Sequence, residues 1–209
     1  MSRARLALLV SGGGRTALNI AERCRGIRAE RRALDAEVAL VVAHREDAPA
    51  VARCRADGLR VAILPATAGV GTAELDDRID AVLEAAGVDL VCLAGYLRRF
   101  RVGERWAGRA LNIHPGLLPA FGGHGMYGDR VHQAVLAAGA RESGCTVHEV
   151  DGEYDRGPIV LERRCTVEPT DGVASLAARV FRLECEAYPE AIARHLARHA
   201  AYPILERAR

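Results

Sequence analysis

Leu6-Ala7-Leu8-Leu9-Val10-Ser11-Gly12-Gly13-Gly14-Arg15-Thr16 is the stretch that decides the fold. Its first five residues are apolar, as expected for a central β-strand that is buried on both faces. The glycines form a tight turn, and a helix is expected from about Thr16 to Arg32. A strand, a glycine loop and a helix in this order can bind an anion, because the helix N-terminus presents free N–H groups. The loop does not match G-x-G-x-x-G, so a plain strand-to-helix turn is an equal alternative.

Apolar strands and helical segments then alternate along the chain. Strands are expected at 37–43, 61–64, 89–94 and 109–113, and helices at 48–57, 72–86 and 103–107. This alternation predicts an α/β fold with a doubly wound, mostly parallel, Rossmann-like sheet flanked by helices. After a helix at 129–138, the strands 146–150 and 158–167 are close enough in sequence to form an antiparallel pair. A long amphipathic C-terminal helix is expected over 171–198.

Composition limits the class of protein. The 209 residues are 50% hydrophobic and carry a formal net charge of +2, which fits a soluble domain with no general attraction to nucleic acid or membrane. The 29 basic residues are all arginine, so Schiff-base lysines and a P-loop lysine are excluded. The six cysteines form no C-x-x-C pair and are expected to be reduced. Since no signal peptide or membrane-spanning run is evident, we expect a cytoplasmic protein.

A second informative stretch is Leu111-Asn112-Ile113-His114-Pro115-Gly116-Leu117-Leu118-Pro119. Asn112 and His114 are two residues apart, so on an extended strand their side chains point to the same side. An amide and an imidazole at the carboxyl end of a strand suit the stabilisation of an oxyanion. Two other strand ends, at 11–16 and 95–100, also carry residues suited to a ligand, and all three are expected along one edge of the sheet. A lone histidine in a turn is more often structural, so the functional interpretation depends on the rest of the chain.

An acidic turn over 151–157 supplies Asp155, and the preceding strand supplies His148. A carboxylate beside a histidine raises the imidazole pKa, so Asp155 near His114 would favour the charged ring. There is no G-x-S-x-G elbow, which favours direct attack by a bound amine over a covalent acyl-enzyme. The glycine-rich segment 122–128 is interpreted either as a mobile loop over a ligand or, equally, as a plain surface loop.

At these positions the sequence resembles the folate-dependent phosphoribosylglycinamide formyltransferase family, from about Leu6 to His195. The motifs that carry the resemblance are Val10-Ser-Gly-Gly-Gly14, Leu93-Ala-Gly-Tyr-Leu-Arg98, the stretch from Leu111 to Pro119, Gly144-Cys-Thr-Val-His148, Asp155-Arg-Gly-Pro-Ile159, and Glu184 ahead of Tyr188-Pro189. The resemblance implies transfer of the formyl group of 10-formyltetrahydrofolate to the amine of glycinamide ribonucleotide, a step of de novo purine biosynthesis.

The resemblance also implies roles for the matching residues. The catalytic residues would be Asn112, His114 and Asp155, with Asp155 holding His114 protonated and relaying a proton through water. The ribonucleotide would be bound by Gly13, Gly14, Arg15, Thr16 and Glu184. The folate would be bound by Leu97, Arg98, Arg99, Phe100, Asn112, His148, Val150 and Asp151. Residues 1–209 would form one formyltransferase domain, with a phosphate-binding half at 1–100 and a catalytic, folate-binding half at 101–209. The pair Arg15-Thr16 departs from the residues usual in the family.

Three other functions are compatible with parts of the sequence. A formyltetrahydrofolate hydrolase would use a similar trio but deliver water, and the phosphate-type loop would then have no purpose. A nicotinamide-dependent oxidoreductase could use His44 and Arg45 to meet a 2′-phosphate, but it leaves the motifs around His114 and Asp155 unexplained. A non-catalytic metabolite-binding module is disfavoured by the intact trio.

Metal binding and macromolecular partners are not expected from the sequence. His195 and His199 share a helix face, but no third ligand is evident in the sequence, so a solvated helix end is favoured over a metal site. The expected partners are small-molecule substrates, with neither nucleic acid nor membrane, and the expected state is a monomer or a homodimer.

Overall fold

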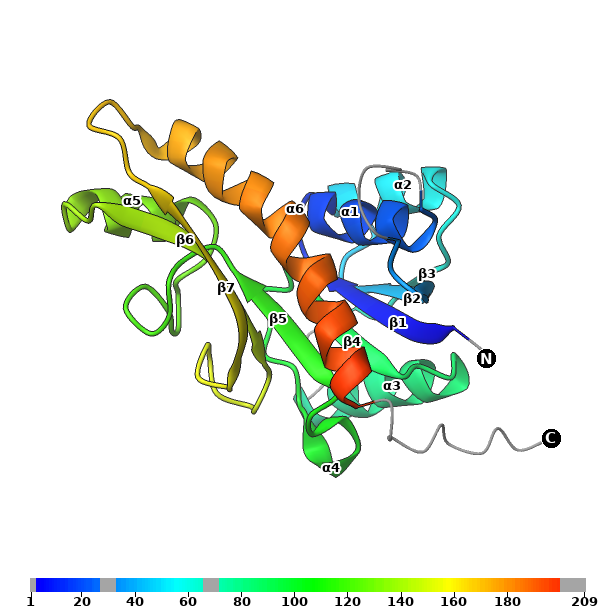
Figure 1. The fold of residues 1–209 in the computed structure, drawn as a ribbon. Coiled ribbons are helices and arrows are strands. Elements are labelled where there is room, and N and C mark those ends of the chain that lie inside the picture. The colour runs from blue at the N-terminus through cyan, green and yellow to red at the C-terminus, as the bar shows by residue number, and fades with distance from the viewer. Residues whose placement is uncertain (1–2, 27–32, 66–71, 200–209) are drawn as a thin grey trace.

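The computed structural model describes residues 3–26, 33–65 and 72–199, in which seven strands form one sheet covered by helices (Figure 1). The strands are β1 (Ala4–Val10), β2 (Ala36–Ala43), β3 (Val61–Ile63), β4 (Leu90–Leu93), β5 (Ala110–His114), β6 (Glu142–Glu149) and β7 (Ile159–Thr166). The helices are α1 (Arg15–Cys24), α2 (Pro49–Ala56), α3 (Thr72–Ala85), α4 (Gly103–Trp106), α5 (Asp129–Ala137) and α6 (Val173–Arg198). Among the described helices, none is both long and apolar enough to cross a membrane.

The strand order is β3-β2-β1-β4-β5-β6-β7. The first five strands in this order run parallel, while β6 pairs antiparallel with both β5 and β7. The predicted doubly wound, mostly parallel sheet and the β6–β7 pair are thus confirmed. Because β5 and β6 are antiparallel neighbours, Asn112 lies opposite His148 and His114 lies opposite Thr146. The sheet register therefore brings two distant sequence motifs together.

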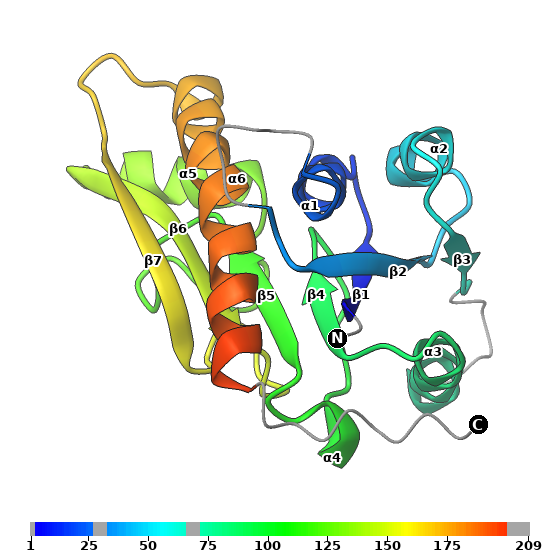
Figure 2. The same cartoon turned by 45° about the vertical axis from the view of Figure 1, so that its right-hand side comes forward.

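Both faces of the sheet are covered, as the continuous apolar strands predict. Leu6, Leu8 and Val10 belong to the core beneath α1, α2 and α6, whereas Ala7 and Leu9 belong to the core beneath α3 and α4. Figure 2 shows α1 and α2 on one side of the central strands and α3 on the other. The period-two alternation of side chains on β1 explains how one strand serves both layers.

Helix α6 is fastened to the middle of the sheet by a buried tyrosine. The Tyr188 hydroxyl lies 3.1 Å from the carbonyl oxygen of Leu93 on β4 and 2.9 Å from that of Leu111 on β5. Tyr188 is completely buried. It therefore ties α6 to the two strands whose ends carry the site described below.

We expect Tyr188→Phe to lower the free energy of unfolding by about 1–3 kcal/mol, because the variant leaves two carbonyl groups with one buried donor fewer. Urea unfolding of the full chain measures this change. Tyr154→Phe is the matched control, since the Tyr154 side chain is 40% exposed and loses little. Equal midpoints for the Tyr188 variant and the unchanged protein would contradict the assignment.

Two predicted boundaries are wrong. Helix α1 ends at Cys24, not at about Arg32, because Gly26 adopts a positive φ of 69° and the Leu34 amide donates to the Arg23 carbonyl. Residues 27–32 of that predicted helix lie outside the described part of the chain. Strand β6 begins at Glu142, earlier than predicted, since Gly144 pairs with Arg164 of β7. A Cβ at Gly144 would lie 1.9 Å from a backbone oxygen of β7, so this glycine serves the sheet and not a turn.

Candidate active site

A cavity of about 640 Å³ opens at the carboxyl ends of β1, β4 and β5. The three predicted strand ends all line it. The ends after β1 and β4 are joined by the Ser11 amide, which donates to the Gly95 carbonyl, and by the Leu97 amide, which donates to the Ser11 hydroxyl. The predicted residues that line the cavity are Gly13, Gly14, Arg15, Thr16, Leu97, Arg98, Arg99, Phe100, Asn112, His114, His148, Val150, Asp155 and Glu184. Asp151 lies instead in an adjoining hollow, together with Arg98, Arg99 and Phe100.

The Asp155 carboxylate is the point at which the polar groups converge. Its Oδ1 lies 3.4 Å from the Asn112 amide nitrogen and 3.4 Å from His148 Nε2. Its Oδ2 lies 3.5 Å from His114 Nδ1 and accepts a hydrogen bond of 2.9 Å from the Gly123 amide. Burial raises the pKa of Asp155, but the two histidines and the Gly123 amide outweigh it and leave that pKa below its ordinary value. The carboxylate is therefore ionised at neutral pH and can accept a proton.

Asp155 has an unusual backbone conformation. Among the described non-glycine residues, it is the one with a positive φ, at 56°. This left-handed conformation costs of order 1 kcal/mol or more, and such strain gathers at functional sites because the surrounding structure holds it. In this conformation the carboxylate faces Asn112 and His148 through Oδ1 and His114 through Oδ2.

His114 is held from both sides of its ring. Its Nε2 donates to the Phe121 carbonyl at 2.6 Å, and its Nδ1 faces Asp155. Burial lowers the pKa of His114 from its ordinary value of 6.5, and this effect outweighs the opposing influence of Asp155. Asp155 and the Phe121 carbonyl both favour the charged ring against the effect of burial, so the support of a protonated His114 by Asp155 stays a prediction. Desolvation disfavours the charged form of this buried ring, whereas the neighbouring carboxylate favours it.

Asn112 and His148 form a second contact at the same point. The His148 ring donates through Nδ1 to the Glu149 carbonyl at 2.7 Å, which leaves Nε2 facing the Asn112 amide at 3.1 Å. The amide nitrogen of Asn112 is thereby directed into the cavity beside Asp155. Asn112 and His114 thus offer a hydrogen-bond donor and a proton-accepting nitrogen on the same side of β5, as their spacing predicts.

The glycine loop closes the other end of the cavity. Gly14 is the N-cap of α1 with φ 75°, and a Cβ there would lie 2.9 Å from the Ala50 backbone. Arg53 of α2 donates to the Gly13 carbonyl at 2.8 Å. The Arg15 guanidinium lies over the Phe181 ring, 4.0 Å from its centroid. The loop therefore joins a helix N-terminus to two arginines, an arrangement that suits an anionic group.

We expect Gly14→Ala to destabilise the protein by about 1–3 kcal/mol and to raise KM for a phosphorylated substrate, because a side chain at positive φ is strained and meets α2. Urea unfolding and steady-state kinetics measure the two effects. Gly12→Ala is the matched stability control, since a Cβ at Gly12 meets no atom within 4 Å. An unfolding midpoint of Gly14→Ala equal to that of the control would refute the prediction.

Glu184 of α6 lines the cavity near Arg15. Burial raises the pKa of Glu184 to about 7, although Arg15 opposes the shift. Near neutral pH the carboxyl group exists in both protonation states, so it can donate a hydrogen bond as well as accept one.

The glycine-rich segment 122–128 is part of the site. Gly122 is packed so closely that a Cβ would lie 2.3 Å from the Leu118 side chain and 3.1 Å from Asp155 Cβ. The Gly123 amide binds the Asp155 carboxylate, and residues 123–128 line the cavity. The interpretation as a plain surface loop is therefore wrong, because the loop shapes the wall around Asp155.

Several lining residues have no individual role predicted from the sequence. They are Tyr96, His124, Tyr127, Arg130, His132, Tyr154 and Phe181. His132 is buried, and its Nδ1 has no hydrogen-bond partner within the described residues. The helical period of α5 could have indicated that His132 faces inward together with Val131 and Val135, which are also buried. Nothing in the local sequence, however, places α5 beside His114.

We expect protein stability to fall as the pH is lowered below about 6.5. Burial lowers the pKa values of His114, His132 and His195 from 6.5, so the unfolded chain binds more protons than the folded chain below that pH. Glu184 acts in the opposite direction, because its raised pKa makes the folded chain hold a proton that the unfolded chain releases. Thermal unfolding from pH 7.5 to pH 5.5 measures the balance, and Glu184→Gln should steepen the loss. A melting temperature that rises towards pH 5.5 would contradict the predicted direction.

Comparison with known proteins places this geometry in a family. Residues 4–192 match the formyl transferase family. A phosphoribosylglycinamide formyltransferase of Haemophilus influenzae is 33% identical over 187 residues, which is 88% of this chain and 84% of that protein. A chloroplastic phosphoribosylglycinamide formyltransferase of Arabidopsis thaliana is 40% identical over 197 residues, which is 91% of this chain. This chain spans 64% of the Arabidopsis protein and 60% of the similar protein of Vigna unguiculata.

Solved structures agree with the sequence comparison. The crystal structure of glycinamide ribonucleotide transformylase 1 from Geobacillus kaustophilus is 30% identical with a TM-score of 0.81, covering 91% of this chain and 97% of that chain. The corresponding structure from Symbiobacterium toebii is 36% identical with a TM-score of 0.80, covering 92% of this chain and 87% of that chain. Sequence and fold lead to the same conclusion, and the chain belongs to the formyl transferase family.

Proposed function

We propose that this protein transfers the formyl group of 10-formyltetrahydrofolate to the amine of glycinamide ribonucleotide, the phosphoribosylglycinamide formyltransferase reaction of de novo purine biosynthesis. The observation that carries the proposal is the convergence of Asn112, His114 and Asp155 in the cavity that also contains the glycine loop. The names of the relatives support the choice of substrates.

The cavity has a suitable place for each part of the two substrates. The ribonucleotide phosphate binds at Gly13, Gly14, Arg15 and Thr16, where the N-terminus of α1 offers free N–H groups. The pterin binds between the segment 97–100 and Val150, which form another part of the wall. In this arrangement Glu184 binds the ribose or glycinamide end. The 1–100 half supplies the phosphate loop and the 101–209 half supplies the catalytic trio.

The proposed chemistry begins with attack of the substrate amine on the formyl carbon. A C–N bond forms and the carbonyl oxygen becomes an oxyanion, which the Asn112 amide stabilises by a hydrogen bond. The negative charge favours the protonated form of His114, whose Nδ1 takes up a proton from Asp155, and the charged ring also stabilises the oxyanion. Asp155 accepts, through water, the proton that the amine loses. When the oxyanion re-forms the carbonyl and the bond from the formyl carbon to the folate nitrogen breaks, His114 returns this proton through water to the folate nitrogen.

A direct assay tests this function. Purified protein is supplied with 10-formyltetrahydrofolate, with and without glycinamide ribonucleotide, and the formation of tetrahydrofolate and formylated ribonucleotide is measured. We expect product only when both substrates are present, without added metal. Formate release that does not depend on the ribonucleotide would instead indicate a formyltetrahydrofolate hydrolase. Tight binding of NADPH without formyl transfer would favour the oxidoreductase.

A further inference from the structure

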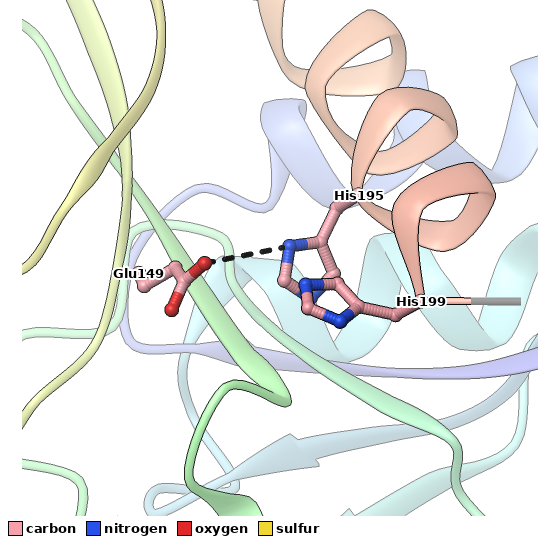
Figure 3. Close-up of side chains that lie close together, drawn as sticks. All are labelled: Glu149, His195 and His199. Carbon is pink, nitrogen blue, oxygen red and sulfur yellow. Dashed lines mark ion pairs between the residues drawn. The ribbon is translucent and has the colours of Figure 1, made fainter. Parts of the chain in front are cut away.

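A cluster of three side chains lies outside the cavity, where the end of α6 meets the end of β6. Figure 3 shows His195 and His199 projecting from the end of α6 towards Glu149. One ligand atom from each residue can be chosen so that all three lie within 4.8 Å of one another. The two imidazole rings have centroids 4.4 Å apart, and His195 Nδ1 lies 3.8 Å from a Glu149 carboxylate oxygen. The sequence indicated the two histidines, and the fold adds the carboxylate.

His195 is oriented as a metal ligand is usually oriented. Its Nε2 lies 2.8 Å from the Gly108 carbonyl oxygen, which can only accept, so Nε2 carries a proton. In the neutral ring the lone pair is then on Nδ1, and Nδ1 faces Glu149. Metal-binding histidines commonly donate their other N–H to a backbone carbonyl in this manner, because the hydrogen bond selects the tautomer and fixes the ring.

A simple ion pair explains the cluster less well. The side chain of His195 is only 3% exposed, and its Nε2–H group is already used by the Gly108 carbonyl. The distance of 3.8 Å from His195 Nδ1 to the Glu149 carboxylate oxygen is also long for a hydrogen-bonded ion pair. A neutral imidazole whose lone pair faces a carboxylate gains nothing from the contact, whereas a cation between them would bind both groups.

We propose that Glu149, His195 and His199 bind one divalent transition-metal ion of the zinc type. Two imidazoles and one carboxylate form a ligand set that Zn²⁺ accepts in proteins, with the fourth position left to water. Ligand bonds of about 2.0–2.2 Å require the three ligand atoms to draw together by roughly 1 Å. Glu149 and His199 are both less buried than His195 and lie at the ends of their elements, where small rotations are tolerated.

The metal site is separate from the cavity. Successive residues on a strand point to opposite faces, so Glu149 points towards α6 while His148 points towards Asp155. A metal ion there joins the last turn of α6 to β6 and so stabilises the contact between helix and sheet. It also restrains Glu149, whose carbonyl oxygen accepts the hydrogen bond from His148. The role is structural, and it does not depend on the proposed formyl transfer.

Titration of the metal-free full chain tests the site. We expect Zn²⁺ to bind with a stoichiometry of one by calorimetry, and to raise the melting temperature by about 5–10 °C at a hundredfold excess over Kd. Co²⁺ should give the visible bands of a four- or five-coordinate ion, without the strong near-ultraviolet band of a thiolate ligand. His199→Ala and Glu149→Gln should each weaken binding by about 100-fold or more and abolish the thermal shift.

Two variants serve as matched controls. Glu190→Gln removes a carboxylate of α6 that pairs with Arg163 and Arg194, and His124→Ala removes an exposed histidine of the glycine-rich segment. Both should bind Zn²⁺ as the unchanged protein does. Changes at the partly exposed His199 and Glu149 are preferred to changes at buried His195, which would disturb folding. Unfolding of each variant in the absence of metal verifies that it folds.

Four results would overturn the proposal. They are the absence of saturable Zn²⁺ binding, unchanged affinity in His199→Ala and Glu149→Gln, a thiolate band that assigns the ion to a cysteine, and loss of binding in Asp155→Asn, which would place the ion in the cavity. Formyl transfer is measured separately. If the protein binds the metal ion but does not transfer the formyl group, the proposed function is refuted and the metal site is not. If it transfers the formyl group but binds no metal ion, the metal site is refuted and the proposed function is not.

Discussion

Asp155→Asn should lower kcat for formyl transfer by about 100-fold or more, with little change in KM for the ribonucleotide. The amide keeps the shape of the side chain but cannot accept the proton that the attacking amine releases. Asparagine also tolerates the left-handed backbone conformation at this position, where φ is 56°, so the loss reports chemistry and not strain. Asp155→Ala would add the strain of a side chain without a local hydrogen bond, and it is the less informative variant.

Steady-state and single-turnover measurements distinguish the effects of Asp155→Asn. The single-turnover rate should fall as far as kcat, because the chemical step itself is slowed. Asp57→Asn is the matched control, since Asp57 pairs with Arg25 at the surface and does not line the cavity. A variant at position 155 with near-normal kcat would exclude Asp155 from the proton transfer.

His114→Ala should likewise lower kcat by about 100-fold or more, because the variant loses a charge that stabilises the oxyanion and the group that takes up a proton. Added imidazole should restore part of the activity by occupying the space that the ring leaves. Circular dichroism and thermal unfolding must show a folded protein, since His114 is only 2% exposed and its removal opens a small cavity. Full activity in this variant would assign oxyanion stabilisation to Asn112 without His114.

The pH dependence refines the role of His114. Burial lowers the pKa of His114 below 6.5 in the free protein, and the ring must be neutral to take up a proton. We therefore expect the acid limb of kcat/KM to lie below pH 6.5. That limb should be absent in His114→Ala, whose residual rate depends less on pH. An acid limb above pH 7 in the unchanged protein would contradict the direction of the shift.

Some features of this protein could be predicted from local sequence because they depend on local physics. The apolar run at β1 determines a strand buried on both faces, and the glycines after it determine the turn into α1. The two-residue spacing of Asn112 and His114 determines that they share a side of β5. The proximity of β6 and β7 in the sequence favours their antiparallel pairing, which the structure contains.

Other features depend on elements that meet only after folding. Arg53 binds the glycine loop because α2 packs beside α1, and no local pattern indicates that contact. The same reason explains why His132 was not recognised as a cavity residue, and why Asp151 turned out to face an adjoining hollow. Long-range packing decides which side chains share a cavity, whereas periodicity only decides which side of an element they occupy.

The sequence by itself determined the order of strands and helices and the glycine loop, and its resemblance to a family predicted that Asn112, His114 and Asp155 act together. Only the tertiary structure shows that burial opposes the charge that Asp155 favours on His114, because desolvation depends on every group packed around the ring. Only the tertiary structure brought Glu149 to His195 and His199. Strand β6 and the end of α6 are distant in sequence and come together because α6 packs on β6. The spacing of residues in the sequence indicates which side chains lie on the same side of one helix or strand. The pKa of a side chain and the groups that could bind an ion together depend on the residues that folding packs around them.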